Sequence, residues 1–163
     1  SFLEDDDIWP ENYLENVYSE NYTKYDYIVV PIKKLQNGKI SNYKNPKDKI
    51  TLNNFLMSNP GINISNLSIK KKSFFEVGGF DLDLITSVDK SIVIKFLKKK
   101  FVNKVCEKVS VIKRFHEKNF TFEPKVFLKN MRLFYSKYKS LMSFKIKIKF
   151  LKKYIYYKFF KNA

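Results

Sequence analysis

The order of apolar and polar residues changes period several times along the first 124 residues of the chain. Apolar residues spaced three and four positions apart predict helices, whereas β-branched or alternating runs predict strands. The helical segments are residues 10–22, 71–80 and 86–100. The strand-like segments are residues 1–3, 25–41, 62–70 and 109–115. Because helices and strands are mixed along the sequence, the pattern predicts an α/β or α+β layered domain.

Glycine and proline mark the ends of several segments. Asn37 and Gly38 form a hairpin turn signal, so residues 25–41 are predicted to be a β-hairpin, with Pro31 at an edge position. The two glycines at 78–79 are expected to stop the helix before them. Pro124 predicts the start of a further helix, because the first helical residue has no intrahelical partner for its nitrogen.

Basic charge is concentrated after Pro124. The 163 residues carry a formal net charge of +16, and residues 125–163 contain 12 Lys and Arg but no Asp or Glu. This leaves 20 basic and 16 acidic residues, a net +4, for residues 1–124. We therefore divide the chain into a body, residues 1–124, and a basic helical tail, residues 125–163. An apolar content of 44% argues against disorder, and a single cysteine, Cys106, excludes internal disulfides.

The tail has two apolar stripes at helical spacing. The first stripe is Phe127, Met131, Phe134, Tyr138 and Leu141. The second stripe is Phe144, Ile148, Leu151, Ile155 and Phe159. We expect the first to pack on the body and the second, surrounded by lysines, to lie on an anionic membrane surface through residues 143–163. The alternation in FKIKIKF leaves a strand open as the alternative.

A run of four acids occupies residues 4–7, directly after the first strand-like segment. Ligands collect at the carboxyl ends of strands in α/β sheets, where Mg²⁺ or Mn²⁺ takes one or two carboxylates together with substrate phosphates. The alternative is that Asp5, Asp6 and Asp7 only stabilise the N-terminus of a helix that begins near Pro10. The acidic run alone leaves both interpretations open.

Four segments together resemble a known enzyme family. They are FLEDDDIWPENYLE, GINISNLSIKKKSFFEVGGFD, SVDKSIVIKFLKKK and RFHEKNFT. In this order they resemble the second half of a family 2 glycosyltransferase, an inverting, nucleotide-sugar-dependent enzyme with a GT-A fold. The resemblance spans residues 1 to about 122. It implies the C-terminal portion of a Rossmann-like GT-A mixed-sheet domain, without the nucleotide-binding N-terminal half, so that this chain alone is expected to be incomplete and inactive.

The resemblance implies a metal site and a catalytic base. In the family the acidic motif binds the metal, here Mn²⁺ or Mg²⁺, through Glu4, Asp6 and Asp7, although Glu4 stands where the family usually has Asp. The base matches Asp89, which would accept the proton of the acceptor hydroxyl. In the family this base belongs to a pair of adjacent acids, and Val88 stands here in place of the first acid of that pair.

The residues around Asp89 also permit a structural reading. Thr86-x-x-Asp89 has the form of a capping box, which stabilises the start of a helix. The two roles are compatible with each other.

Further site residues follow from the same resemblance. His116 and Arg114 match the segment that faces the donor diphosphate. Gly78, Gly79 and Asp81 match the acceptor-side loop, in which Asp81 is expected to stabilise the turn and not to react.

The predicted function is transfer of a sugar, with inversion, from a nucleotide-diphosphate sugar to a saccharide or lipid-linked acceptor, in surface polysaccharide or glycoconjugate synthesis. The expected location is cytoplasmic, with a peripheral position on the inner face of the membrane. One alternative is a non-catalytic interaction or scaffold domain derived from the same fold. A basic nucleic-acid-binding module is the other, but it leaves the acidic run unexplained, so no nucleic-acid partner is expected.

Overall fold

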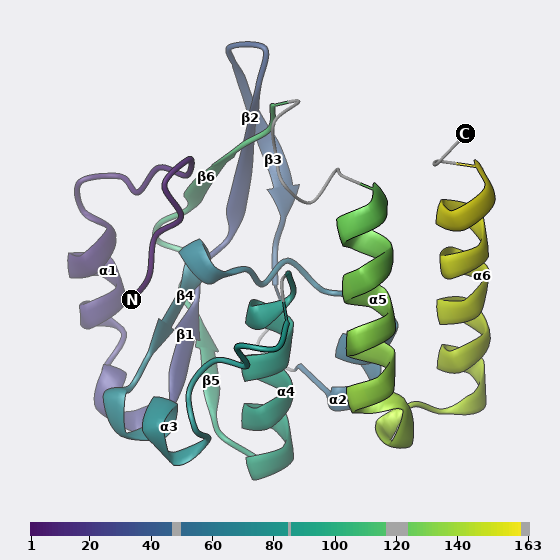
Figure 1. The fold of residues 1–163 in the computed structure, drawn as a ribbon. Helices are drawn as coiled ribbons and strands as arrows, with labels where there is room; N and C mark the ends of the chain where they lie inside the picture. The colour runs from purple at the N-terminus through teal and green to yellow at the C-terminus, as the bar shows by residue number, and fades with distance from the viewer. Residues whose placement is uncertain (47–49, 85, 117–123, 161–163) are drawn as a thin grey trace.

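The computed structural model describes residues 1–46, 50–84, 86–116 and 124–160, which form a mixed α/β structure (Figure 1). The helices are α1 (Tyr13–Ser19), α2 (Leu52–Met57), α3 (Lys71–Glu76), α4 (Val88–Lys99), α5 (Pro124–Tyr138) and α6 (Phe144–Phe160). The strands are β1 (Tyr27–Val29), β2 (Ile32–Gln36), β3 (Lys39–Lys44), β4 (Leu67–Ile69), β5 (Asn103–Val105) and β6 (Val111–Arg114). The α/β prediction is confirmed at this level.

The strands form two three-stranded sheets, and both sheets are mixed. In the first, β1 lies between β4, which is antiparallel to it, and β5, which is parallel. In the second, β2 lies between antiparallel β3 and parallel β6. The predicted hairpin is present as β2 and β3, joined at Asn37 and Gly38.

Pro31 has a different place from the one predicted. It does not lie at the edge of one long hairpin arm but separates β1 from β2, which belong to different sheets. Proline has no N–H to donate to a ladder, so the first arm breaks there. The Pro31 carbonyl accepts a hydrogen bond from the Val111 N–H at 3.0 Å, while the preceding Val30 N–H donates to the Asn66 carbonyl at 3.1 Å.

Two further strand predictions need correction. Residues 1–3 form no strand, and the Glu4 N–H donates to the Ser65 side chain at 3.0 Å and not to a neighbouring strand. Within the segment 62–70 only β4 is a strand, and it follows a short 3-10 turn at Ile64–Asn66. Strand β5 was absent from the pattern, because its three residues include polar Asn103 and Lys104 and show no run of apolar positions.

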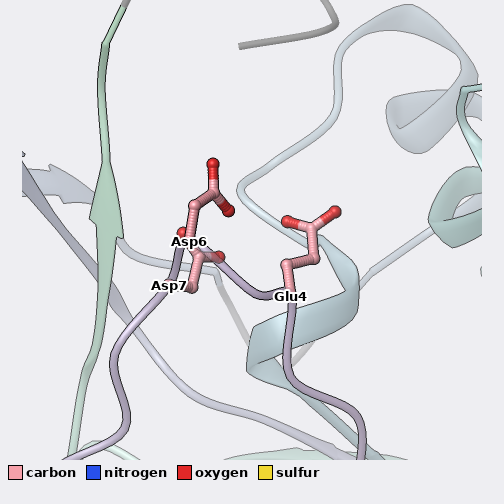
Figure 2. A group of neighbouring side chains, drawn as sticks. All are labelled: Glu4, Asp6 and Asp7. Atoms are coloured by element: carbon pink, nitrogen blue, oxygen red, sulfur yellow. The ribbon is translucent and has the colours of Figure 1, made fainter. Parts of the chain in front are cut away.

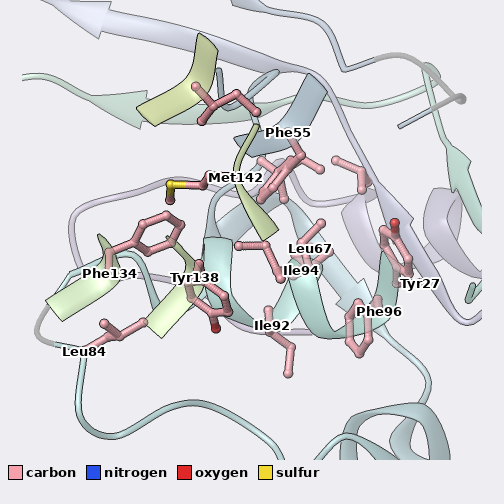
Figure 3. Close-up of a cluster of buried hydrophobic side chains, with 14 residues drawn as sticks. Tyr27, Phe55, Leu67, Leu84, Ile92, Ile94, Phe96, Phe134, Tyr138 and Met142 are labelled. Atoms are coloured by element: carbon pink, nitrogen blue, oxygen red, sulfur yellow. The ribbon is translucent and has the colours of Figure 1, made fainter. Parts of the chain in front are cut away.

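Strand β1 has helices on both of its faces. Tyr27 and Val29 belong to a core cluster that includes residues of α4 and α5 (Figure 3), whereas Ile28 and Val30 belong to a second cluster with α1. Successive side chains of a strand point to opposite faces, so this short buried run serves two cores. The sheet therefore lies between α1 and α4, as Figure 1 shows.

The two tail helices are packed differently. Met131, Phe134 and Tyr138 of α5 are buried, which confirms that the first stripe packs on the body. Helix α6 lies outside α5 (Figure 1), and each residue of its predicted stripe is between 39% and 79% exposed. The helical interpretation of FKIKIKF is confirmed. None of the helices in the described ranges combines the length and the apolarity that crossing a bilayer requires.

Candidate functional site

The acids at residues 4–7, which we call the acidic loop, are held between β6 and the turn before β4. Ile8 and Ile112 exchange two backbone hydrogen bonds of 2.9 and 3.0 Å, which fix the end of the loop on β6. The indole N–H of Trp9 donates to the Ser65 carbonyl at 2.7 Å, and its ring stacks on Tyr13 with centroids 4.2 Å apart. The loop is thus tied to residues that are distant in sequence.

Three carboxylates of this loop converge. Glu4, Asp6 and Asp7 each offer one oxygen, and these oxygens all lie within 4.8 Å of one another (Figure 2). The side chain of Asp7 is fully buried, and its Oδ2 has no hydrogen-bond partner among the described residues. A buried carboxylate oxygen without a partner is costly, and a cation removes that cost.

The environment of Asp7 favours its neutral form when no cation is present. Burial raises the pKa of Asp7, and the charges of Glu4 and Asp6 raise it further, while Ser65 and Lys113 only partly offset them. Oxygen ligands of this kind suit hard divalent cations such as Mg²⁺ and Mn²⁺. The three side chains therefore fit the metal that was predicted for them.

Lys113 and His116 supply basic groups to the same loop. The Lys113 Nζ lies 3.0 Å from Glu4 Oε2 and 3.9 Å from Asp7 Oδ2, and the His116 Nε2 lies 3.2 Å from Asp6 Oδ2. Burial alone would lower the pKa of Lys113, but Glu4 and Asp7 hold it above its ordinary value. With all three carboxylates ionised, as they would be around a bound cation, they and the Lys113 ammonium would carry a net charge of −2, which a divalent cation balances.

Lys113 is a site residue that no family motif singles out. The sequence signal for Lys113 is its spacing from Val111. Lys113 lies two residues after buried Val111, so both side chains are on the same face of β6. Its neighbour Arg114 contacts the acidic loop through the main chain, where its N–H donates to Asp7 Oδ1 at 3.3 Å. Arg114 is exposed.

Asp89 lies in the first turn of α4, and the acidic loop acts on it electrostatically. Burial raises the pKa of Asp89, Lys90 lowers it, Glu4 adds to the increase, and Lys113 opposes it. Asp89 Oδ1 accepts a hydrogen bond from the Lys90 N–H at 2.7 Å. A raised pKa brings a carboxylate closer to the range in which it is an effective base near neutral pH.

The capping-box interpretation of Asp89 is wrong. The N-cap of α4 is Ser87, in the left-handed conformation, and no side-chain cap hydrogen bond is present there. Buried Asn130 of α5 supports this turn instead: its Oδ1 accepts from the Thr86 N–H at 3.0 Å, and its Nδ2 donates to Ser87 Oγ at 3.1 Å. The sequence signal for Asn130 is a polar residue directly before Met131 of the first apolar stripe.

The acceptor-side loop predicted at Gly78, Gly79 and Asp81 lies beside the residues that precede the acidic loop. Gly78 and Gly79 end α3 with φ of 74° and 63°, and a Cβ on Gly79 would lie 3.2 Å from the Phe74 ring. These left-handed conformations favour glycine. Phe2, two residues before Glu4, packs against Phe80 of the same turn with ring centroids 5.0 Å apart.

Asp81 is saturated by donors from α4 and α5. Its carboxylate forms ion pairs with Lys95 at 2.9 Å and Lys137 at 3.0 Å, and it accepts hydrogen bonds from Tyr138 at 3.0 Å and from Ser91. Burial alone would raise the pKa of Asp81, but these donors outweigh it and hold the pKa well below its ordinary value. This set of contacts, which we call the Asp81 network, is the arrangement expected of a structural carboxylate.

The structure thus brings Glu4, Asp6, Asp7 and His116 together, with Asp89 under the electrostatic influence of Glu4. It does not bring Asp81 to them.

Comparisons of the chain with models of known protein families, with curated proteins and with solved structures found no match.

Proposed function

We propose that this chain is the metal- and acceptor-binding part of an inverting glycosyltransferase of the GT-A type, which uses a nucleotide-diphosphate sugar as donor. The observation that carries the proposal is the convergence of Glu4, Asp6 and Asp7, in which the buried Oδ2 of Asp7 has a long ion pair with Lys113 but no hydrogen bond among the described residues. The electrostatic effect of Glu4 on Asp89 supports a single site for both functions.

Each group has a separate role in this proposal. The three carboxylates would hold Mn²⁺ or Mg²⁺, which when bound neutralises charge on the leaving diphosphate. His116, beside Asp6, would contact the donor diphosphate. Asp89 would take the proton of the acceptor hydroxyl. At the same time the acceptor oxygen would bond to the sugar carbon, and the bond from that carbon to the diphosphate oxygen would break.

The test of the base is Asp89→Asn in the active enzyme that contains this chain. A positioned general base contributes about 10²- to 10⁴-fold, so sugar transfer should fall by at least about 10²-fold while the thermal midpoint stays nearly unchanged. Asp83→Asn is the matched control, because Asp83 is 88% exposed and lies outside the site. Retained transfer by the Asp89 variant would reject the assignment.

We also propose that α6 rests on an anionic membrane surface, as the charge and stripe of the tail predict. Phe144, Leu151 and Phe159 of this helix are 79%, 57% and 60% exposed. Lysines lie between them along the helix, which contains no acidic residue. A groove of about 570 Å³ between α5 and α6 continues this apolar surface past Ile148 and Tyr154. Apolar side chains and lysines on one helix suit the headgroup layer of such a membrane.

The membrane proposal is tested by substitution, because Ile146 of α6 is buried in the body and deletion of the helix would disturb the core. Leu151→Asn and Phe159→Asn together should weaken sedimentation with phosphatidylglycerol vesicles by at least about tenfold, since each removes about 1.5–3 kcal/mol of apolar burial. Leu82→Asn is the control, because Leu82 is 95% exposed on the body. Equal binding by all variants would reject the proposal.

A further inference from the structure

A second site lies on the α6 side of Asp89, in a cavity of about 310 Å³. Residues of β3, α2, α4, α5 and α6 line it, and its apolar wall includes Phe55, Phe134 and Ile146. Four lysines also line it: half-buried Lys44 of β3 and Lys90 of α4, and exposed Lys149 and Lys153 of α6. Three elements that are distant in sequence therefore direct basic side chains to one space.

These four lysines have no carboxylate in ion-pair contact among the residues that the structure describes. Their contacts are of other kinds. Lys44 Nζ donates to the Asn59 carbonyl at 3.4 Å, Lys90 Nζ lies 5.8 Å from the centre of the Phe134 ring, and Lys153 Nζ lies 5.1 Å from that of Phe127. These contacts position Lys44, Lys90 and Lys153, but they do not compensate the positive charges.

The lysines also repel one another. Partial loss of hydration lowers the pKa of Lys153, and the charges of Lys90, Lys149 and Lys44 lower it further. Burial and Lys90 likewise lower the pKa of Lys44, against an opposing effect of Asp89. An anion in the cavity would convert this repulsion into attraction.

We propose that this cavity binds a phosphate-class anion, as a monophosphate or diphosphate group. Lysine is a compact ammonium donor that suits phosphate oxygens, and Ser87 and Asn130 add neutral polar groups to the lining. The volume equals that of roughly ten water molecules at about 30 Å³ each, which accommodates a diphosphate. Four positive charges distinguish this cavity from the acidic loop, which attracts cations.

The position of the cavity gives the anion a place in the reaction, and this step rests on the proposed function. Ser87 and Lys90, on either side of Asp89 in the chain, line the cavity, whereas the carboxylates of the acidic loop do not. An anion in it would thus lie near the proposed base and outside the group of carboxylates that would hold the donor. The phosphate then belongs to the acceptor. It is carried either by a lipid headgroup or by a soluble phosphorylated saccharide.

The site is tested by calorimetry with inorganic pyrophosphate, in the presence of a chelator so that no metal at the acidic loop contributes. Lys153→Gln and Lys90→Gln should each weaken binding about tenfold, the value of one charged hydrogen bond. Lys152→Gln and Lys98→Gln are matched controls, because these lysines lie on the same two helices as Lys153 and Lys90 but do not line the cavity. They should change affinity less than about twofold, as screened surface charges do.

Thermal unfolding provides the second measurement for the same variants. Pyrophosphate should raise the midpoint of the unaltered chain more than chloride at equal ionic strength, and the increase should shrink only in the cavity variants. Absence of binding, or equal losses in cavity and control variants, would overturn the site. Because no metal is present, this result is independent of metal binding by the acidic loop and of sugar transfer.

Vesicles and a soluble ligand distinguish the two sources of the phosphate. If the source is a lipid headgroup, Lys153→Gln should weaken binding to phosphatidic acid vesicles by about tenfold more than Lys152→Gln does. If the source is soluble, the same difference should appear with glucose 1-phosphate and not with vesicles. A difference with neither ligand would overturn the assignment of the cavity to the acceptor.

Discussion

The acidic loop and the Asp81 network both gather acids and lysines, but they differ in how fully the acids are satisfied. Asp81 receives donors from Ser91, Lys95, Lys137 and Tyr138, and its pKa lies well below its ordinary value. Asp7 has one oxygen without a hydrogen-bond partner among the described residues, and its pKa is raised. A carboxylate with a full set of protein donors has no capacity left for a ligand, whereas one short of donors does.

The largest expected effect is on stability, at the satisfied acid. Asp81→Asn removes the counter-ion of Lys95 and leaves Lys137 with its longer ion pair to exposed Asp83. It should lower the free energy of unfolding by about 2–3 kcal/mol, less than a fully buried pair because both lysines reach solvent. Urea denaturation measures this loss. Asp83→Asn, in the same loop but exposed, should change it by less than about 0.5 kcal/mol.

The same comparison separates what the sequence can predict from what it cannot. Local signals were sufficient where one segment determines the outcome: Pro124 begins α5, the glycines at 78–79 end α3, and the acids at residues 4–7 lie together because they are neighbours in the chain. The pattern also predicts the buried stripe of α5, since helical spacing places Met131 and Phe134 on one face.

The remaining features depend on contacts between distant segments. Lys113 becomes a partner of the acidic loop only because β6 pairs with Ile8, and Asn130 supports the start of α4 only because α5 docks beside it. The division into two sheets follows from the pairing of β1 with β5, a strand too short and too polar to be visible in the sequence. No local pattern encodes these choices, because tertiary packing decides them.

A smaller effect is expected at Asn130, which links α5 to the turn before Asp89. Asn130→Ala removes two hydrogen bonds from the residues that precede α4, so it should lower the free energy of unfolding by about 1–2 kcal/mol. Lys129→Ala is the neighbouring control, because Lys129 is exposed. If both variants lose the same amount, the effect reflects α5 as a whole and not its support of the α4 start.

The smallest stability effect is expected at Asp7, and it has the opposite sign. Its raised pKa means that the folded chain binds a proton more readily than the unfolded chain, so the charge of Asp7 reduces stability once the pH exceeds about 3.9. Asp7→Asn should therefore stabilise the metal-free chain at neutral pH by about 1 kcal/mol, the low end of the cost of an unsatisfied buried polar group.

The pH dependence of unfolding tests both acids in one series of denaturation curves. For Asp81 the depressed pKa means that its contribution is complete above about pH 3.9, the unfolded value, and is lost as the pH falls below it. Asp81→Asn should thus flatten the curve below about pH 4, whereas Asp7→Asn should flatten it above that value. Identical curves for the two variants would mean that the acids do not differ in the way proposed.

The most direct test of the central claim is calorimetric titration of the chain with Mn²⁺. The account predicts uptake of one ion, weakened at least tenfold (about 1.4 kcal/mol) by Asp7→Asn and unaffected by Asp5→Asn, which removes the same charge from an exposed position in the same loop. Absence of uptake, or equal weakening by both variants, would contradict it and leave the acidic loop without a metal-binding role.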